Sequence, residues 1–146
     1  MTFPTAALDS LGTIQTGSTP STSDESLWGG DLPFVTPAEL DQPEPILAAP
    51  RTLTDAGAAQ ARVLKKDAVL VCCIGSLGKV GLAGRNLVTN QQINSIEFDE
   101  KLVFPKYGFY ACQRLKPKLE TMAPATTVPI VNKSKFGQLE IPLPPL

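Results

Sequence analysis

The stretch Ala68-Val69-Leu70-Val71-Cys72-Cys73-Ile74 largely sets the predicted fold. The run is uninterrupted and apolar, several of its residues are β-branched, and it has the length of a strand, so it predicts a buried β-strand. Gly75-Ser76-Leu77-Gly78 follows as a turn, and residues 79–83 form a second predicted strand that Gly84 ends. We therefore predict a β-hairpin at the centre of the chain, with a turn that needs positive φ.

Two further strands are predicted on the C-terminal side of this hairpin. Residues 93–98 place Ile96 and Phe98 on one face and Glu97 on the other, as a half-buried strand does. Near the end of the chain, apolar residues alternate in the same way, and the prolines among them confine that strand to a sheet edge: Leu139, Ile141 and Leu143.

One main helix is predicted between these two strands. Pro105 opens it, and an apolar stripe recurs every three or four residues along its buried side: Tyr107, Ala111, Leu115, Leu119 and Met122. The opposite side is polar, with Lys106, Gln113, Arg114 and Lys116. Pro117 is expected to kink or restart the helix, because proline cannot sit inside a regular one.

The first third of the chain is predicted to be rich in loops and short elements. Residues 17–24 read as an exposed loop, and residues 32–35 as a short extended stretch. A capping box at residues 36–39 and a capped, Ala-rich segment at residues 54–61 each predict a short helix. We expect a single α+β domain over residues 1–146, with a loop- and β-rich part at 1–66 and strands plus one main helix at 67–146.

The charges divide the chain into opposed halves. The formal net charge is −1, which by itself argues against nucleic acid. Residues 1–60 hold one basic residue, Arg51, and eight acidic ones, whereas residues 61–146 hold twelve basic and six acidic residues. Net charges of −7 and +6 therefore predict that a DNA partner meets the half after residue 60 and that the acidic half faces elsewhere.

Composition excludes several classes of chemistry. The chain has no histidine, which removes histidine-based nucleophilic catalysis and His-ligated zinc. The three cysteines, Cys72, Cys73 and Cys112, form neither a disulfide framework nor a Cys-x-x-Cys pair. We expect Cys72 and Cys73, inside the apolar run, to be small buried hydrophobes, and the compartment to be reducing, the cytoplasm. No apolar run is long enough to span a membrane, and the N-terminus does not read as a signal peptide.

Three catalytic or nucleotide-binding motifs are only partly matched. Residues 75–79 lack the four-residue spacing of a phosphate loop and the Ser or Thr after its lysine. Asp99-Glu100-Lys101 resembles part of a metal-dependent nuclease site, but Asp67 is the only candidate for the earlier acid that such a site needs. A methyltransferase would need a Gly-rich cofactor loop and a base-pocket motif, and neither is found. We expect no catalytic residue and no metal site.

Features that suit nucleic acid do occur. Basic residues lie in or beside predicted turns: Lys65, Lys66, Lys79, Arg85, Lys133 and Lys135. Amides cluster around the start of the strand at 93–98, where they could either bond to base edges or cap turns: Asn90, Gln91, Gln92 and Asn94. Trp28 suits either a core anchor or a surface on which a base stacks.

Five segments together resemble a known family in order and spacing. They are Leu11-Gly12-Thr13-Ile14-Gln15-Thr16-Gly17-Ser18-Thr19-Pro20, residues 28–36, residues 75–79, residues 89–94 and Ile141-Pro142-Leu143-Pro144-Pro145-Leu146. The chain is similar over nearly its whole length to a target recognition domain of a type I restriction–modification specificity subunit.

This resemblance implies a fold and a role. The fold would have a β-rich N-terminal part and an α+β C-terminal part, like a DNA methylase specificity domain. The role would be to read one half of a split site on double-stranded DNA, without catalysis. Modification subunits would bind S-adenosylmethionine, and a restriction subunit would use ATP and Mg²⁺, so this chain itself would hold no cofactor. The family's long spacer helix does not follow Leu146, so we expect a single recognition domain without its spacer, either a fragment of a longer subunit or a truncated gene product.

We expect the DNA-contacting residues to be polar and basic side chains in loops. Phosphates would be positioned by Lys79, Arg85, Lys133 and Lys135, and base edges would be met by Asn90, Gln91, Gln92, Ser18 and Thr19. The alternative is a protein-interaction fragment that assembles with another specificity fragment or a modification subunit and binds no DNA alone. A third hypothesis, a small nuclease that uses Asp99 and Lys101, has the least support.

Overall fold

The computed structural model describes residues 3–123 and 128–146. Its central sheet has the strand order β2-β8-β5-β6, and all neighbours are antiparallel. The strands are β2 (Gly12–Thr16), β5 (Val69–Cys72), β6 (Val80–Leu82) and β8 (Ile93–Phe98). The predicted strands at the centre of the chain are confirmed, and β2 is a strand that sequence reasoning did not find.

The strand β5 is uniformly apolar because the sheet is covered on both faces. Val69 and Val71 belong to a core cluster that includes Phe109, Leu119 and residues near the C-terminus. Leu70 and Cys72 alternate to the other face and pack in a second cluster with Leu40, Ile46, Leu64 and Leu87. A strand buried on both sides has no polar face to show, which is why its sequence carries no alternation.

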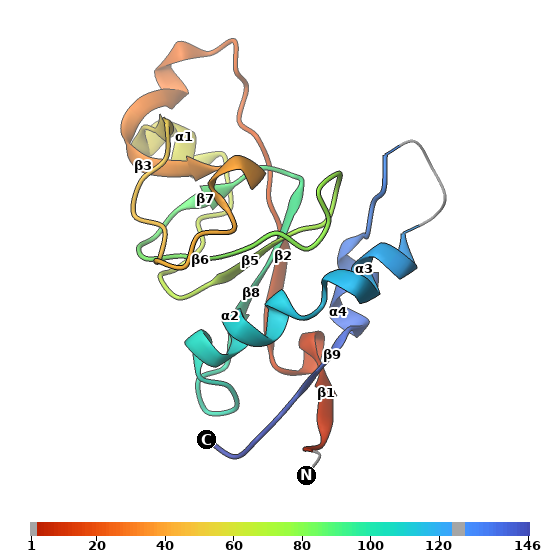
Figure 1. The fold of residues 1–146 in the computed structure, drawn as a ribbon. Helices are drawn as coiled ribbons and strands as arrows, with labels where there is room; N and C mark the ends of the chain where they lie inside the picture. Colours follow the sequence, from red (N-terminus) through yellow and green to blue (C-terminus); the bar gives the residue numbers. More distant parts are fainter. Residues whose placement is uncertain (1–2, 124–127) are drawn as a thin grey trace.

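Helices cover one face of the central sheet (Figure 1). They are α2 (Pro105–Gln113), α3 (Lys116–Met122) and α4 (Lys133–Gln138). The predicted single helix is interrupted between α2 and α3, and Pro117 lies in the first turn of α3, where its missing N–H leaves no hydrogen bond unmade. The restart at Pro117 is therefore confirmed, whereas α4 was missed.

A smaller sheet packs above the central one in Figure 1. Its order is β4-β3-β7, with β3 (Trp28–Val35), β4 (Arg51–Leu53) and β7 (Val88–Thr89). Short helices flank it: η2 (Glu25–Leu27), η3 (Pro37–Glu39) and α1 (Asp55–Ala59). Both predicted short helices are confirmed, since Thr36 N donates to Glu39 Oε1 at 2.8 Å and Gly57 N donates to Thr54 Oγ1 at 3.2 Å.

The two ends of the described chain meet in a two-stranded sheet. β1 (Thr5–Ala7) pairs antiparallel with β9 (Glu140–Pro142), and η1 (Leu8–Ser10) leads from β1 toward β2. β9 is the predicted proline-bounded edge strand, with Ile141 fully buried. This small sheet lies at the lower end of the molecule in Figure 1.

The two halves of the sequence are interleaved in space. β2, from the first half, is an edge strand of the central sheet, and β7, from the second half, completes the small sheet. A change in composition near residue 60 therefore does not mark a boundary in the fold. Within the loop expected at residues 17–24, Pro20 is buried rather than exposed. No helix in the described residues is long and apolar enough to span a membrane.

Candidate nucleic-acid interface

One end of the central sheet gathers most of the polar residues singled out in the sequence. Because the neighbours are antiparallel, the ends of β2 and β5 lie beside the start of β8. We call the segments that meet here, residues 17–19, 74–79 and 89–92, the loop rim. Backbone bonds hold them together: Ser18 N donates to Thr89 O at 3.1 Å, and Cys73 N donates to Gln92 O at 2.8 Å.

The amide side chains at the rim are of two kinds: some are hydrogen-bonded within the protein, and one is exposed to solvent. Asn90 Oδ1 accepts from Gln92 N at 3.1 Å and so stabilises its own turn, whereas Gln92 Nε2 donates to Ile74 O at 3.3 Å and joins the turn to the neighbouring hairpin. Asn94 is buried and donates to Val131 O at 3.3 Å. Gln91 is exposed, and within the described part of the chain only its Oε1 is bonded, by Thr19 Oγ1 at 2.5 Å. Gln91 and Thr19 are thus the amide and hydroxyl that face solvent together.

Two of the expected basic residues lie on a helix rather than in a turn. Lys133 and Lys135 belong to α4, whose N-terminus is capped by Asn132, which accepts from Lys135 N at 2.9 Å. The expectation of a turn was wrong because the Asn132 cap precedes an apolar pair, Phe136 and Leu139, spaced for one helix face. Both lysines remain exposed, and Asn94 connects their helix to the sheet through Val131.

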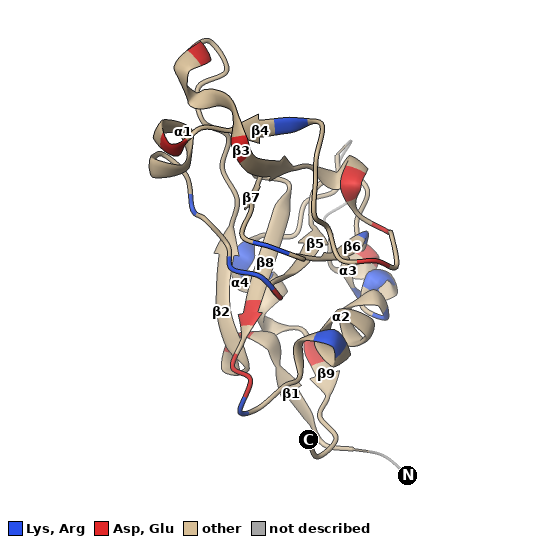
Figure 2. Cartoon of the chain, turned by 90° about the vertical axis from the view of Figure 1, so that its left-hand side faces the viewer, with Lys and Arg blue, Asp and Glu red and all other residues tan. Residues whose placement is uncertain are grey.

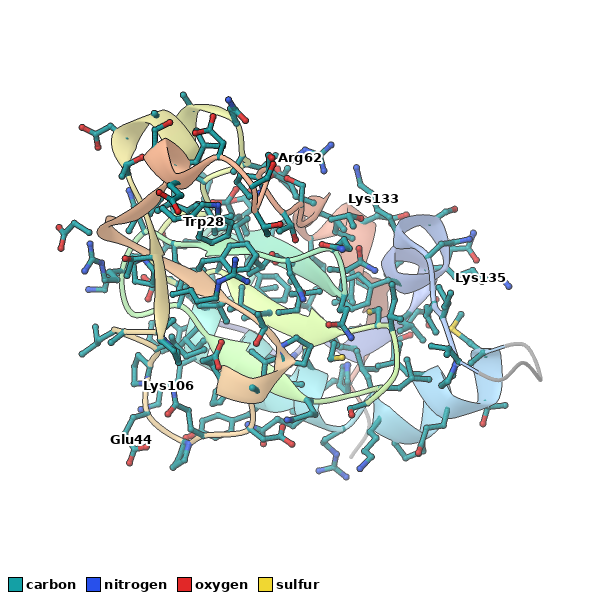
Figure 3. All side chains as sticks on the ribbon, turned by 90° about the horizontal axis from the view of Figure 1, so that it is seen from above. Trp28, Glu44, Arg62, Lys106, Lys133 and Lys135 are labelled. Carbon is teal, nitrogen blue, oxygen red and sulfur yellow. The ribbon has the colours of Figure 1, made fainter. Side chains whose placement is uncertain are left out.

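Arg62 belongs to the same face, although sequence reasoning did not select it. Its Nη1 donates to Thr16 O at 2.5 Å, at the end of β2, in a hydrogen bond at the exposed surface. Figure 3 shows Arg62, Lys133 and Lys135 along one side of the molecule, with Lys106 and Glu44 on the opposite side. Nothing in the local sequence marks Arg62, because only the fold brings it to β2.

Lys79 and Arg85 lie at opposite ends of the central sheet. Lys79 directly precedes β6 in the rim hairpin, in which Gly75 and Gly78 have φ of 82° and 87°, as the predicted turn requires. Arg85 follows β6 at the other end, and its Nη2 lies 3.6 Å from Asp31 Oδ2, in the only ion pair that the described residues make. Arg85 therefore does not join the other expected DNA-contacting residues.

The smaller sheet and the short helices beside it carry more acidic than basic residues. We call η2, β3, β4 and α1 the acidic lobe, because Glu25, Asp31 and Asp55 lie on it and Arg51 is its only basic residue. Figure 2 shows this lobe with acidic residues on β3 and α1 and the single basic segment on β4. The lobe holds three of the eight acidic residues of residues 1–60, and Ser18 and Thr19 of that same half lie in the rim.

Trp28 is half-buried, so part of its ring packs in the protein and part of it is exposed to solvent. Its ring lies 5.1 Å from that of Phe34, edge to face, and its Nε1 donates to Ser21 O at 3.0 Å. The Arg51 guanidinium carbon lies 4.0 Å from the centre of the indole ring. These three contacts fix the ring.

The cysteines and acids do not form a reactive site. All three thiols are buried, and desolvation raises the pKa of Cys72 and brings those of Cys73 and Cys112 to about 12. Asp99 Oδ1 accepts from Lys101 N at 3.0 Å, so the Asp99 side chain stabilises a turn of the backbone. The described residues contain no group of three or more acids or cysteines that could hold a metal ion.

The fold and the rim together define a small α+β recognition domain, with solvent-facing amides and cations in place of reactive groups. A family model matches residues 2–146 and is described as the type I restriction modification DNA specificity domain. The chain belongs to this family, which is the non-catalytic specificity component of type I systems. The predicted family and fold class are therefore confirmed.

The curated relatives that the chain matches are specificity subunits of type I restriction enzymes. The chain is 29% identical over 139 residues to the type I restriction enzyme MjaIX specificity subunit of Methanocaldococcus jannaschii, covering 92% of this chain and 32% of that protein. It is 30% identical over 142 residues to the HindI specificity subunit of Haemophilus influenzae, covering 94% and 31%. The chain thus spans about a third of the length of these relatives.

The solved structures show the same fold. The HsdS subunit of Thermoanaerobacter tengcongensis matches with a TM-score of 0.74 at 21% identity, over 98% of this chain and 33% of that one. The S subunit of a type I restriction-modification system from M. genitalium matches with a TM-score of 0.69 at 21% identity, over 98% and 34%.

Proposed function

We propose that this chain recognises one half of a bipartite site on double-stranded DNA for a type I restriction–modification complex. The observation that carries the proposal is the loop rim with its neighbours, in a chain of the DNA specificity family. There Gln91 and Thr19 face solvent beside cations that lack carboxylate partners in the described residues. Amides that reach base edges and cations that reach phosphates are the two components that sequence-specific DNA binding needs.

The DNA-facing surface that we propose differs from the one expected from the sequence. Lys79, Lys133, Lys135 and Arg62 would contact phosphates, and Gln91, Ser18 and Thr19 would lie nearest to base edges. Asn90 and Gln92 would hold the turn that presents Gln91, because their amides are used within the rim. Arg85 would not contribute, since it pairs with Asp31 at the other end of the sheet.

The proposed function also implies which subunits this chain would assemble with. Modification subunits that bind S-adenosylmethionine and a restriction subunit that uses ATP and Mg²⁺ would be the partners, and the whole would work in the cytoplasm. This chain would bind no cofactor of its own. A further matched structure concerns complex assembly and conformational transition of the type I R-M system, which supports a complex as the working state.

The proposal is tested by DNA selection and by the salt dependence of binding. We expect the chain to enrich a short consensus from a library of random duplexes, with an affinity that falls steeply with salt. Replacing both Lys133 and Lys135 by alanine should lower the slope of log K against log salt by about two, because each phosphate contact contributes roughly one. Lys106→Ala is the matched control, because Lys106 is also an exposed lysine in the first turn of a helix but lies on the opposite side (Figure 3).

Two results would overturn the proposal. If the wild-type chain enriches no sequence, it does not read DNA. If Lys106→Ala changes the slope as much as the double variant does, the DNA does not bind on the face of α4 and the rim.

A second candidate function is supported by an apolar cleft of about 350 Å³ beside the C-terminal segment. It is lined by Leu102, Val103, Phe104, Tyr107, Leu143, Pro144, Pro145 and Leu146. Phe104 is 61% exposed and Leu146 76% exposed, and such apolar surface favours a protein contact. This cleft supports the protein contact of the alternative expected from the sequence. That alternative has the chain bind no DNA alone, whereas a contact at the cleft leaves the rim free for DNA, because the two lie at different ends of the central sheet.

A further inference from the structure

Arg51 is an exposed arginine that the fold holds in one place. Its guanidinium carbon lies 4.0 Å from the centre of the Trp28 ring and 5.4 Å from that of Phe34. The indole is itself fixed by Phe34 and by its hydrogen bond to Ser21 O. A guanidinium stacked on a fixed ring loses little further freedom when its edge binds a ligand.

The donors of this guanidinium are unused within the structure. In the described part of the chain, Arg51 has no hydrogen-bond acceptor and no ion pair, although it sits in the acidic lobe. It opens onto a cleft of about 420 Å³ lined by Thr22, Glu25, Trp28, Gly29, Pro50, Arg51 and Thr52. An arginine that is fixed and yet has no internal partner suits an external acceptor.

Two kinds of ligand can accept two hydrogen bonds from the planar guanidinium group, and the charges around the cleft favour one of them. Guanine, through O6 and N7, and phosphate both accept two parallel hydrogen bonds. Glu25 lines the same cleft, and Asp31 and Asp55 lie on the same lobe. These negative charges oppose a phosphate anion more strongly than they oppose the guanine edge, which carries no net charge.

A short segment of chain connects the loop rim to the cleft, since Thr19 belongs to the rim and Thr22 lines the cleft. Ser21, which anchors the indole, lies two residues after Thr19, whose hydroxyl bonds to Gln91. A duplex that meets Thr19 and Gln91 can therefore extend along the loop to Trp28 and Arg51.

We propose that Arg51, held over the ring of Trp28, reads a guanine in the DNA target and so determines part of its sequence specificity. This inference rests on the proposed function, because it needs DNA at the rim. It places a base-reading residue in the half of the sequence that charge alone assigned away from DNA. Trp28 acts as a positioning residue that orients the fork.

The experiment compares consensus sequences selected from one random duplex library by wild type, Arg51→Ala, Arg51→Lys and Arg114→Ala. We expect one guanine preference to be lost in both Arg51 variants, with the other consensus positions kept. Lysine keeps the charge but cannot make the bidentate contact. Discrimination at that position should fall by roughly 5- to 150-fold. Arg114→Ala, an exposed arginine at the end of α2, should leave the consensus unchanged.

Trp28 supplies a second readout, because it is the only tryptophan in the chain. Binding of the selected duplex should change its fluorescence in wild type. The change should be smaller in Arg51→Ala at saturating duplex, since the guanine is no longer held beside the ring.

The outcomes separate this inference from the function on which it rests. If wild type enriches no sequence, the proposed function fails and the inference fails with it. If Arg51→Ala weakens all duplexes equally and keeps the consensus, Arg51 contacts phosphate and only the inference is overturned. If Trp28 emission does not respond to bound duplex, the cleft faces a protein partner or solvent, and again only the inference is overturned.

Discussion

At the scale of single residues, burial decides the chemistry of the thiols. Cys73 and Cys112 have pKa values raised by desolvation from 9.0 to about 12, and Cys72 is shifted in the same direction. Only the thiolate is a nucleophile. These cysteines therefore act as small apolar residues, Cys72 and Cys73 at the end of β5 and just after it, and Cys112 on α2. For Cys72 and Cys73 the apolar run around them predicts this.

We predict that the thiols do not react in the native state and that the protein loses stability in alkali. Between about pH 9 and pH 12 the unfolded chain releases thiol protons that Cys73 and Cys112 keep in the folded state, so the free energy of unfolding falls as pH rises through this window. Below this window the thiols are protonated in both states and contribute no slope.

Two measurements check this prediction. Labelling with a thiol reagent should proceed fully only in denaturant. Urea melts at increasing pH should show a smaller alkaline loss in Cys112→Ala than in wild type. Rapid stoichiometric labelling of the native protein at pH 8 would contradict the burial of these residues.

The amides of the rim show what a residue pattern can and cannot specify. The cluster of Asn90, Gln91 and Gln92 is visible in the sequence, and both of its interpretations are present in the structure. Asn90 and Gln92 bond within the turn, and Gln91 faces solvent. No local pattern distinguishes them, because the acceptor for Gln92 is Ile74 O on the neighbouring hairpin.

At the scale of elements, the hairpin between β5 and β6 depends on two glycines that are not equivalent. Gly75 has a φ of 82°, and a Cβ there would meet only Gln92 Nε2, at 3.7 Å. Gly78 has a φ of 87°, and a Cβ there would lie 2.6 Å from Lys116 Cβ and 2.8 Å from its Cα. Gly78 is therefore a contact with the start of α3 as well as a turn residue.

We predict that Gly78→Ala is more destabilising than Gly75→Ala. Gly75→Ala should lower the free energy of unfolding by about 1–2 kcal/mol, the usual cost of positive φ for a residue with a Cβ. Gly78→Ala should cost more, because the start of α3 must also move. Urea unfolding measures both values, and equal losses would mean that the hairpin separates from α3 at little cost.

Elements with local signals were predictable, and elements that depend on distant partners were not. The caps at Thr36 and Thr54 and the restart at Pro117 act within one turn of chain, so the sequence reveals them. β2 and β7 were missed because β2 is only half-buried and β7 has two residues. Their strand conformation is stabilised by pairing with β8 and β3 rather than by their own pattern.

At the scale of the whole molecule, two surfaces lie apart. The rim with α4 presents amides and cations, and the end with β1 and β9 presents the apolar cleft around Phe104. Such a separation allows DNA and a protein partner to be bound together. It also allows the two functions to be tested independently.

We predict that Phe104→Glu weakens association with a modification subunit by roughly fivefold or more, because a buried aromatic anchor at an interface is worth more than about 1 kcal/mol. Thermal stability and DNA selection should not change, since Phe104 is 61% exposed and far from the rim. Tyr110→Glu is the control, an aromatic residue on α2 that is 52% exposed and does not line the cleft. Sedimentation with the purified partner gives the result, and equal effects of both variants would exclude the cleft as the contact.

Local pattern, composition and order along the chain were enough to specify the hairpin at residues 68–83, the capped short helices, the absence of histidine chemistry and the family. They were not enough to show which polar residues share a surface, which depends on the tertiary structure. Folding brings Thr19 to Gln91 and Arg62 to Thr16, and it pairs Arg85 with Asp31 at the opposite end of the sheet. Antiparallel pairing of β2 with β8 brings together residues more than seventy positions apart. The net charge of one half of the sequence does not determine which residues pair in this way.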